Sequence, residues 1–155
     1  VSPSSRNAND PDAITVSRVI DGDTIEVFIE GQEETVRIIG INTPETVDPR
    51  KPVECLGQEA SNAAKAMLSE GEIITLTADP TQDDRDKYGR LLRYVQEEDG
   101  QDVGWWLIVQ GYAYEYTYRV PYERQATYKE AENVAQNEQR GLWGDTCENE
   151  NTSAE

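Results

Sequence analysis

The stretch 35–45, Thr-Val-Arg-Ile-Ile-Gly-Ile-Asn-Thr-Pro-Glu, is the feature that most constrains the fold of this chain. Its first seven residues are rich in β-branched side chains and predict a strand buried on much of both faces. Pro44 has no N–H to donate to a sheet, so the strand must end before it. Arg37 interrupts the apolar run, and burying an arginine is costly unless it meets an anion. The stretch therefore predicts a buried strand that carries a cation, with a carboxylate, Glu45, just past its end.

The remaining chain supplies four more short strands and three helices. Alternating or β-branched runs predict strands at 14–20, 24–29, 73–78 and 91–95. Amphipathic or apolar runs that end near glycine predict helices at 58–69, 103–110 and 122–139. Three strands joined by short turns form an antiparallel meander. Together these elements predict an α+β fold, a five-stranded OB-type β-barrel with about three packed α-helices.

A chain of 155 residues is long enough for one domain with its own core. We expect that domain at 14–144, preceded by a disordered polar lead-in at 1–13 and followed by an acidic tail at 145–155. No apolar run approaches the roughly 18 residues of a membrane-spanning helix. Nothing in the sequence predicts a dimer, so we expect a monomer.

The net charge of −17 is unusual for a protein that binds a polyanion, because nucleic-acid-binding domains are usually basic. Only four of the 14 basic residues are lysine. An acidic, lysine-poor surface suits a high-salt habitat, where long-range repulsion between like charges is screened. The composition therefore favours a halophilic source.

The chain contains no histidine. This excludes Ser-His and Cys-His nucleophile systems, a histidine general base and histidine-containing zinc sites. Two cysteines cannot form a Cys₄ zinc site either. If the chain is an enzyme, carboxylates must act as the base and arginines must stabilise negative charge. Any bound metal should be a hard cation with oxygen ligands.

Each polar motif at a strand end also has a purely structural interpretation. Asp-Gly-Asp-Thr at 21–24 is an ordinary turn sequence, Asn-Thr-Pro-Glu at 42–45 an ordinary strand exit, and Lys-Tyr-Gly-Arg at 87–90 an ordinary hairpin. Arg37 is the hardest to explain structurally, since a buried arginine needs an anionic partner. Asp21 is one candidate for that partner.

Taken together, the motifs resemble the staphylococcal nuclease (thermonuclease) family. The matching segments are Val-Ile-Asp-Gly-Asp-Thr-Ile at 19–25, Val-Arg-Ile-Ile-Gly-Ile-Asn-Thr-Pro-Glu-Thr at 36–46, Gly-Gln-Glu-Ala-Ser at 57–61, Asp-Lys-Tyr-Gly-Arg-Leu-Leu at 86–92 and Gln-Gly-Tyr-Ala at 110–113. The similarity follows the family's order and spacing from about residue 14 to residue 143.

The resemblance implies an OB-type barrel that cleaves DNA and RNA with Ca²⁺, with single-stranded nucleic acid as the preferred substrate. Arg37, Glu45 and Arg90 match the family's catalytic positions, with Glu45 as general base and the arginines on the phosphate. For the metal, Asp23 matches a direct calcium ligand, Thr43 a ligand through its backbone carbonyl, and Asp21 a carboxylate near the ion. Tyr88 matches a tyrosine that contacts the bound nucleotide, and Lys87 lies beside it in the same motif.

The sequence departs from the family pattern in three places. Asn42 stands where the best-known members have a calcium-ligating aspartate; its amide oxygen can still coordinate, but one negative charge is missing. Tyr116 and Tyr118 are the candidates for substrate-stacking tyrosines, although they align only after a one-residue shift, and a place in the core or at the barrel rim is the alternative. The basic loop that would flank the substrate is reduced to Arg50 and Lys51.

The two cysteines, Cys55 and Cys147, lie just before the first predicted helix and near the end of the domain. In a reducing cytosol they would remain thiols. A single pair at the two ends of a domain favours a disulfide, which in turn favours a secreted or cell-surface protein.

Two further functions compete with the nuclease. A non-catalytic nuclease-like OB module that binds nucleic acid or a protein partner has no need of Arg37, Glu45 and Arg90 together. An acidic calcium-binding or interaction domain fits the net charge but leaves the arginines unexplained.

Overall fold

The computed structural model of the chain describes residues 13–44 and 55–144. The acidic tail and all but the last residue of the expected lead-in lie outside the described residues. Within them, no helix is both long and apolar enough to cross a bilayer.

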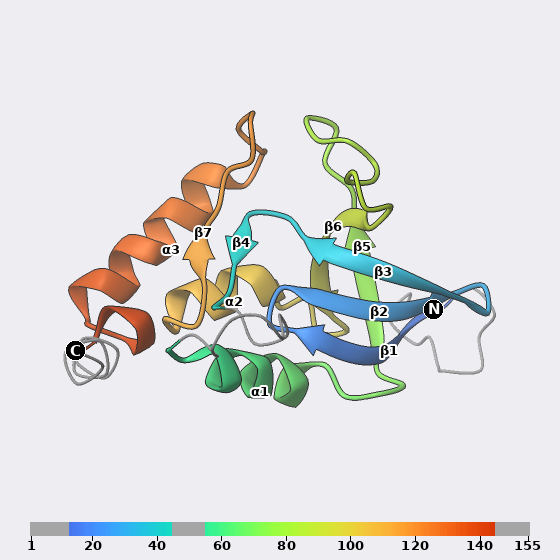
Figure 1. Cartoon of the computed structure of the whole chain (residues 1–155), viewed down its shortest axis with the longest axis horizontal. Helices are drawn as coiled ribbons and strands as arrows, with labels where there is room; N and C mark the ends of the chain where they lie inside the picture. Colours follow the sequence, from blue (N-terminus) through green and yellow to red (C-terminus); the bar gives the residue numbers. More distant parts are fainter. Residues whose placement is uncertain (1–12, 45–54, 145–155) are drawn as a thin grey trace.

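Five strands close into a barrel, as the sequence predicts (Figure 1). They are β1 (Ile14–Asp21), β2 (Thr24–Ile29), β3 (Gln32–Ile38), β5 (Ile73–Thr77) and β6 (Leu91–Glu97), in the order β1-β2-β3-β6-β5 around the barrel. β1 closes the barrel by pairing with β5, and the β3–β6 contact is the parallel one. The structure therefore confirms the α+β fold with an OB-type barrel.

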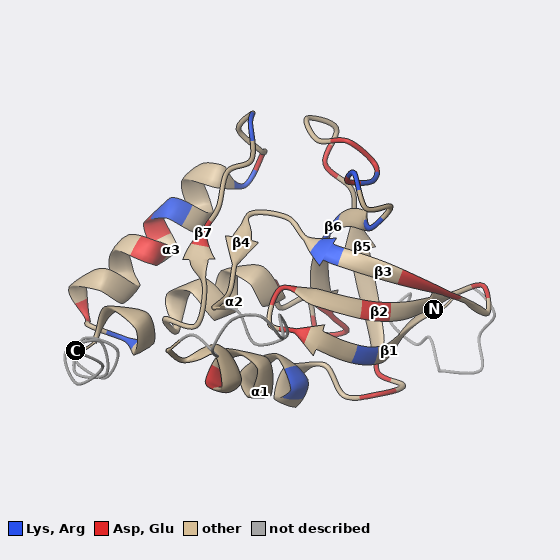
Figure 2. Cartoon of the chain, in the orientation of Figure 1, with Lys and Arg blue, Asp and Glu red and all other residues tan. Residues whose placement is uncertain are grey.

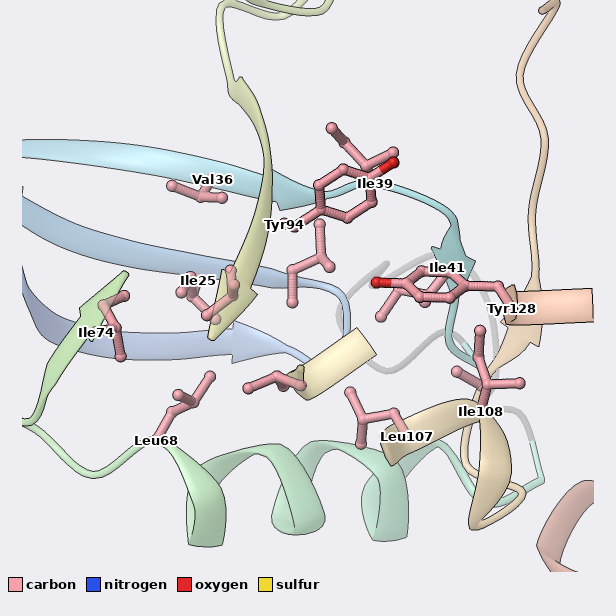
Figure 3. Close-up of a cluster of buried hydrophobic side chains, with 14 of the residues drawn as sticks. Ile25, Val36, Ile39, Ile41, Leu68, Ile74, Tyr94, Leu107, Ile108 and Tyr128 are labelled. Carbon is pink, nitrogen blue, oxygen red and sulfur yellow. The ribbon is translucent and has the colours of Figure 1, made fainter. Parts of the chain in front are cut away.

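The core fills the barrel and continues into the layer between barrel and helices (Figure 3). Alternation along β2 buries Ile25 and Val27, while Glu26 between them is only half-buried. Leu68, which directly follows α1, packs into the same core as Ile74 on β5, and Tyr94 and Tyr128 pack edge to face with ring centroids 6.1 Å apart.

The described residues form three α-helices: α1 (Gly57–Met67), α2 (Val103–Val109) and α3 (Gln125–Asn137). α1 packs on β1 and α2 on β6, whereas α3 lies beyond them and packs on α2 (Figure 1). The Asp102 carboxylate caps α2 by accepting a hydrogen bond from Trp105 N–H at 3.1 Å. The predicted start of the last helix at residue 122 is wrong, because α3 begins at Gln125. The buried Tyr122 is used instead as a core side chain whose hydroxyl donates to Glu115 at 2.7 Å.

The predicted strand 35–41 is interrupted, which is the largest difference from expectation. β3 ends at Ile38, and the chain turns at Gly40, whose φ is +85°. It then forms a separate short strand, β4 (Ile41–Asn42), which pairs with β7 (Tyr114–Glu115) in a small second sheet. Tyr116 N–H donates to Gly40 O at 2.8 Å and extends this pairing.

Gly40→Ala should destabilise the protein strongly. A Cβ at this position would lie 2.7 Å from ring carbons of both Tyr122 and Tyr128, on a backbone conformation that L-residues rarely adopt. We expect the free energy of unfolding, measured by urea denaturation, to fall by about 2 kcal/mol or more.

Gly31→Ala is the matched control, because Gly31 has a φ of +78° but nothing within 4 Å of its Cβ position. The Gly31→Ala variant places an alanine in the same left-handed backbone conformation, but its Cβ meets no neighbouring atom. Equal losses in the two variants would contradict the packing role of Gly40.

Four carboxylates line an open depression of about 490 Å³ beside the C-terminal end of β6: Glu72, Glu97, Glu98 and Asp99. Burial, followed by repulsion from Asp99 and Glu98, raises the pKa of Glu72 above its ordinary value. Burial, with repulsion from Asp99 and Glu72, raises the pKa of Glu97 as well. One oxygen of Glu72 is buried without a hydrogen-bond partner among the described residues.

Glu72→Gln should therefore stabilise the protein at pH 7. A carboxyl whose pKa is higher in the folded state opposes folding when ionised, and this penalty disappears as the pH falls towards its unfolded pKa of about 4.3. We expect the increase in melting temperature to be largest at pH 7 in low salt, and to shrink near pH 4 and in molar NaCl.

Glu70→Gln removes the same charge from a nearby exposed position and serves as the control. A gain from Glu72→Gln that is no larger than the gain from this control would contradict the role of burial.

Candidate functional site

The turn between β1 and β2 places two buried carboxylates at one end of the barrel. Asp21 is paired with Thr24 across the hairpin, and Gly22 and Asp23 form the turn between them. The Asp23 carboxylate accepts hydrogen bonds from the Thr24 hydroxyl at 3.0 Å and from Thr43 N–H at 3.0 Å. Both aspartates are therefore held by the hairpin, and Asp23 also by the segment that follows β4.

Arg37 lies at the end of β3, directly opposite Thr24 in the register of β2 and β3 (the basic end of β3 in Figure 2). Its Nη1 donates to the backbone oxygens of Ile38 at 2.9 Å and Ile41 at 2.8 Å. Its Nη2 lies 3.6 Å from Asp23 Oδ2 and 3.5 Å from Asn42 Oδ1. These Nη2 contacts are longer than the roughly 2.7–2.9 Å of a good charge-assisted hydrogen bond, so Nη2 keeps capacity for another anion.

Asn42 and Thr43 reach this site because the chain reverses at Gly40. Asn42 is exposed and directs its amide oxygen towards Arg37, while Thr43 is buried against Asp23. Asp21, Asp23, Asn42 and Thr43, the four predicted metal-binding residues, therefore all lie at the same end of the barrel as Arg37.

Arg90 is brought to the same region by the parallel pairing of β3 with β6. Arg37 pairs with Leu92 across the two strands, and Arg90 lies two residues before Leu92. The strand spacing and the rise per residue then put the Cα atoms of Arg37 and Arg90 on the order of 8 Å apart. The Asp86 carboxylate holds Arg90 by accepting hydrogen bonds from its Nε at 2.7 Å and its backbone N–H at 3.0 Å. Burial alone would raise the pKa of Asp86, but the hydrogen bonds from Arg90 and Tyr88 outweigh it and leave this pKa below its ordinary value.

Tyr88 and Lys87 stand on the turn that precedes Arg90. Tyr88 is 71% exposed, and its ring lies 5.2 Å from the guanidinium carbon of Arg90 and 5.2 Å from Lys87 Nζ. An exposed aromatic ring between two cations can contact a base or sugar while the cations face a phosphate.

Tyr116 and Tyr118 lie on the surface and not in the core. They are 41% and 54% exposed, and their rings stack at 6.5 Å between centroids. The guanidinium carbon of Arg37 lies 5.8 Å from the centroid of the Tyr116 ring. The β4–β7 pairing, which the sequence did not predict, brings Tyr116 beside Arg37, and Tyr118 stacks on Tyr116.

Several predicted residues lie outside the described part of the chain. Glu45, the predicted general base, follows Pro44 directly and is one of them, as are Arg50 and Lys51 of the shortened basic loop. Cys147 also lies outside, so the disulfide with Cys55 stays a prediction.

Three residues that support the site were missed by the sequence analysis. Asp86 holds Arg90, and the Asp-x-Tyr-Gly-Arg spacing of a side-chain-capped turn could have indicated it. Gly22 and Gly40 leave room for the side chains of Thr43 and of two core tyrosines. Neither close approach leaves a local signal in the sequence.

The arrangement defines a class of protein: an OB-type barrel whose strand ends gather acidic oxygens, guanidinium groups and exposed tyrosines. No group of three or more His, Cys, Asp or Glu suited to a metal ion occurs among residues 13–44 and 55–144. Within that range, a cation would therefore depend on neutral oxygens beside the two aspartates.

Comparison with known proteins agrees with this class. The family profile described as Staphylococcal nuclease homologue matches residues 35–145, more than half of the chain. The chain is 37% identical over 140 residues to a thermonuclease of Staphylococcus hyicus, covering 88% of this chain and 78% of that protein. It is 41% identical over 111 residues to endonuclease YncB of Bacillus subtilis (strain 168), covering 72% of this chain and 51% of YncB.

A thermonuclease of Staphylococcus intermedius is 50% identical over 80 residues, which cover 52% of this chain and 46% of that protein. The chain thus spans about half the length of YncB and of the S. intermedius protein. The chain belongs to the staphylococcal nuclease family.

Proposed function

We propose that the protein is a calcium-dependent nuclease that hydrolyses phosphodiester bonds of DNA and RNA, with single strands preferred. The observation that carries this proposal is the state of Arg37. Two backbone carbonyls fix its Nη1, while the contacts of its Nη2 with the described residues Asp23 and Asn42 are long, at 3.6 and 3.5 Å. The exposed Tyr116 ring, stacked on Tyr118, lies beside the guanidinium. Names of relatives such as thermonuclease and endonuclease point to the same chemistry.

The oxygen donors fit a hard divalent cation. Asp21 and Asp23 are both buried, and Arg37 Nη2 lies 3.6 Å from Asp23 Oδ2, which is longer than a good charge-assisted hydrogen bond. The Asn42 amide oxygen and the Thr43 carbonyl are neutral hard ligands of the type Ca²⁺ accepts. The Thr43 hydroxyl is buried without a partner among the described residues, as expected for a site that binds a further polar group. When bound, Ca²⁺ supplies positive charge to the phosphate that is attacked.

The protein's own residues divide the remaining work. Arg37 and Arg90 hold phosphate oxygens and stabilise the negative charge that increases in the transition state. Asp86 acts indirectly, by fixing the Arg90 guanidinium through Nε so that its two terminal nitrogens can face the substrate. Glu45 accepts the proton of the attacking water.

The aromatic residues support a preference for single strands. Tyr88, Tyr116 and Tyr118 are exposed flat surfaces near the arginines, and unpaired bases can stack on them whatever their sequence. Lys87 adds a positive charge at the same edge. A paired base cannot stack in this way without leaving its helix.

We further propose that the protein works outside the cell as a monomer, with a Cys55–Cys147 disulfide, and that it comes from a salt-rich habitat. The acidic composition supports the last point, because high salt screens repulsion between the protein and a nucleic acid.

The nuclease proposal is tested with heat-denatured DNA, in low and in molar salt, with Ca²⁺ or with a chelator. We expect degradation that needs Ca²⁺ and that falls by about 10²–10⁴-fold in Glu45→Gln, because the base is lost. Release of acid-soluble nucleotides measures the rate.

Glu59→Gln, which removes an exposed carboxylate of α1, is the control and should retain activity. A folded protein that degrades nothing under any of these conditions would contradict the enzyme and favour the non-catalytic binding module.

Asn42→Asp should tighten Ca²⁺ binding by roughly tenfold or more, since it adds a charged oxygen to the site. Isothermal titration calorimetry measures the change. Asn62→Asp adds the same charge on the exposed face of α1 and should leave the affinity nearly unchanged. Equal affinities of Asn42→Asp and the original protein would show that Asn42 does not contact the ion.

A further inference from the structure

Arg119 differs from the other arginines that the structure describes. Every other arginine in the described part of the chain lies within 3.6 Å of a carboxylate oxygen. Arg119 forms no ion pair with any described residue, although the chain carries 31 Asp and Glu. It is exposed on the loop between β7 and α3, whose basic tip is visible in Figure 2. In so acidic a protein, an exposed arginine without a carboxylate partner is available to an anion from outside.

The backbone of this loop turns Arg119 towards the exposed tyrosines. Tyr116 and Tyr118 stack on each other across Thr117, as side chains two residues apart do on an extended chain. Arg119 would then point away from their face, but its backbone is left-handed, with a φ of +65°. Its guanidinium carbon lies 5.1 Å from the centroid of the Tyr118 ring. A left-handed backbone is unfavourable for arginine, and such strain is concentrated at functional sites.

The turn at Arg119 is also tied to a second loop. Val120 N–H donates to Tyr118 O at 2.8 Å and closes the turn. Gln82 Nε2, from the segment between β5 and β6, donates to the carbonyl oxygens of Val120 at 3.3 Å and Pro121 at 3.4 Å. The backbone around Arg119 is therefore positioned before a ligand arrives, which lowers the entropic cost of binding one.

Arg119 completes a row of cation, ring, ring and cation that starts at the strand end of the candidate site. The guanidinium carbon of Arg37 lies 5.8 Å from the Tyr116 ring, the two rings are 6.5 Å apart, and Arg119 follows at 5.1 Å. A single-stranded nucleic acid offers a matching series of flat bases between negatively charged phosphates. A strand whose bases stack on the two rings can therefore present one phosphate to Arg37 and a later one to Arg119.

We propose that Arg119 is a further substrate-binding residue, which holds a backbone phosphate of a single strand beyond the two tyrosines while Arg37 holds the phosphate that is cleaved. The inference rests on the proposed nuclease function and adds a dependence on substrate length. Only a strand long enough to pass over both rings reaches Arg119. Because the contact is made to a phosphate, it favours long substrates without selecting a base sequence.

Arg119→Asn tests the proposal, because asparagine tolerates a left-handed backbone and the variant should remain folded. The rates of Ca²⁺-dependent cleavage are measured on a thymidine dinucleotide, whose one phosphodiester is the scissile one, and on an octathymidylate. We expect the ratio of kcat/KM on the octamer to kcat/KM on the dinucleotide to fall roughly fivefold to tenfold, through KM. On the octamer, the slope of log(kcat/KM) against log[NaCl] should become less steep by about 0.7, the value for one lost phosphate contact on a single strand.

Two further variants separate the contact from general effects of charge. Arg119→Lys keeps the positive charge and should keep the salt slope of the original protein. Lys65→Gln removes a positive charge from the last turn of α1 and should leave both the slope and the ratio nearly unchanged.

Three results would overturn the inference, and they differ in what they leave standing. An Arg119→Asn variant with the ratio and slope of the original protein would show that Arg119 does not bind the strand, while the nuclease proposal stands. Equal losses on the octamer and the dinucleotide would place the effect at the scissile phosphate or in the fold. If the original protein cleaves neither substrate, the proposed nuclease function fails and the inference fails with it.

Discussion

The site depends on how the protein satisfies a half-buried guanidinium at the end of a barrel strand. Arg37 Nη1 is held by the carbonyls of Ile38 and Ile41, which both lie within reach only because the chain reverses at Gly40. The reversal requires a glycine, since Tyr122 and Tyr128 pack against its Cα. Core packing on one side of the strand therefore sets the direction of the arginine on the other.

Charge in this protein is organised locally, within a strongly acidic chain. Arg37 and Arg90 each lie beside one aspartate, Asp23 and Asp86, which orient them without fully compensating them. At the opposite end of β6, four carboxylates line an open depression, and no Lys or Arg of the described residues lines it with them. An incoming phosphate would therefore meet a short-range positive region inside a long-range negative field, and salt weakens the second more than the first.

A buried hydrogen-bond network joins the two loops that carry the exposed tyrosines. The Asp79 carboxylate accepts hydrogen bonds from the Tyr94 hydroxyl at 2.6 Å and from Glu123 N–H at 2.8 Å, across the gap between β5 and α3. Burial opposes ionisation of Asp79, but these bonds and those from Thr81 keep its pKa below the ordinary value. The loop that carries Tyr88 and the segment that carries Tyr118 are thus joined at this carboxylate.

The sequence by itself determined the barrel, the positions of its strands along the chain and most of the polar residues at their ends. Alternation, turn residues and the buried Arg37 are local signals, and they predicted β1, β2, β5 and β6 to within about two residues, the usual uncertainty of element ends. Only the tertiary structure decided that β3 stops at Ile38, that β4 pairs with β7, and that Tyr116 lies beside Arg37. These features depend on contacts between segments more than 70 residues apart. One example is the hydrogen bond that the Tyr122 hydroxyl donates to the Gly40 carbonyl oxygen at 3.3 Å. Such contacts are selected by the packing of the whole core, and no short stretch of sequence encodes them.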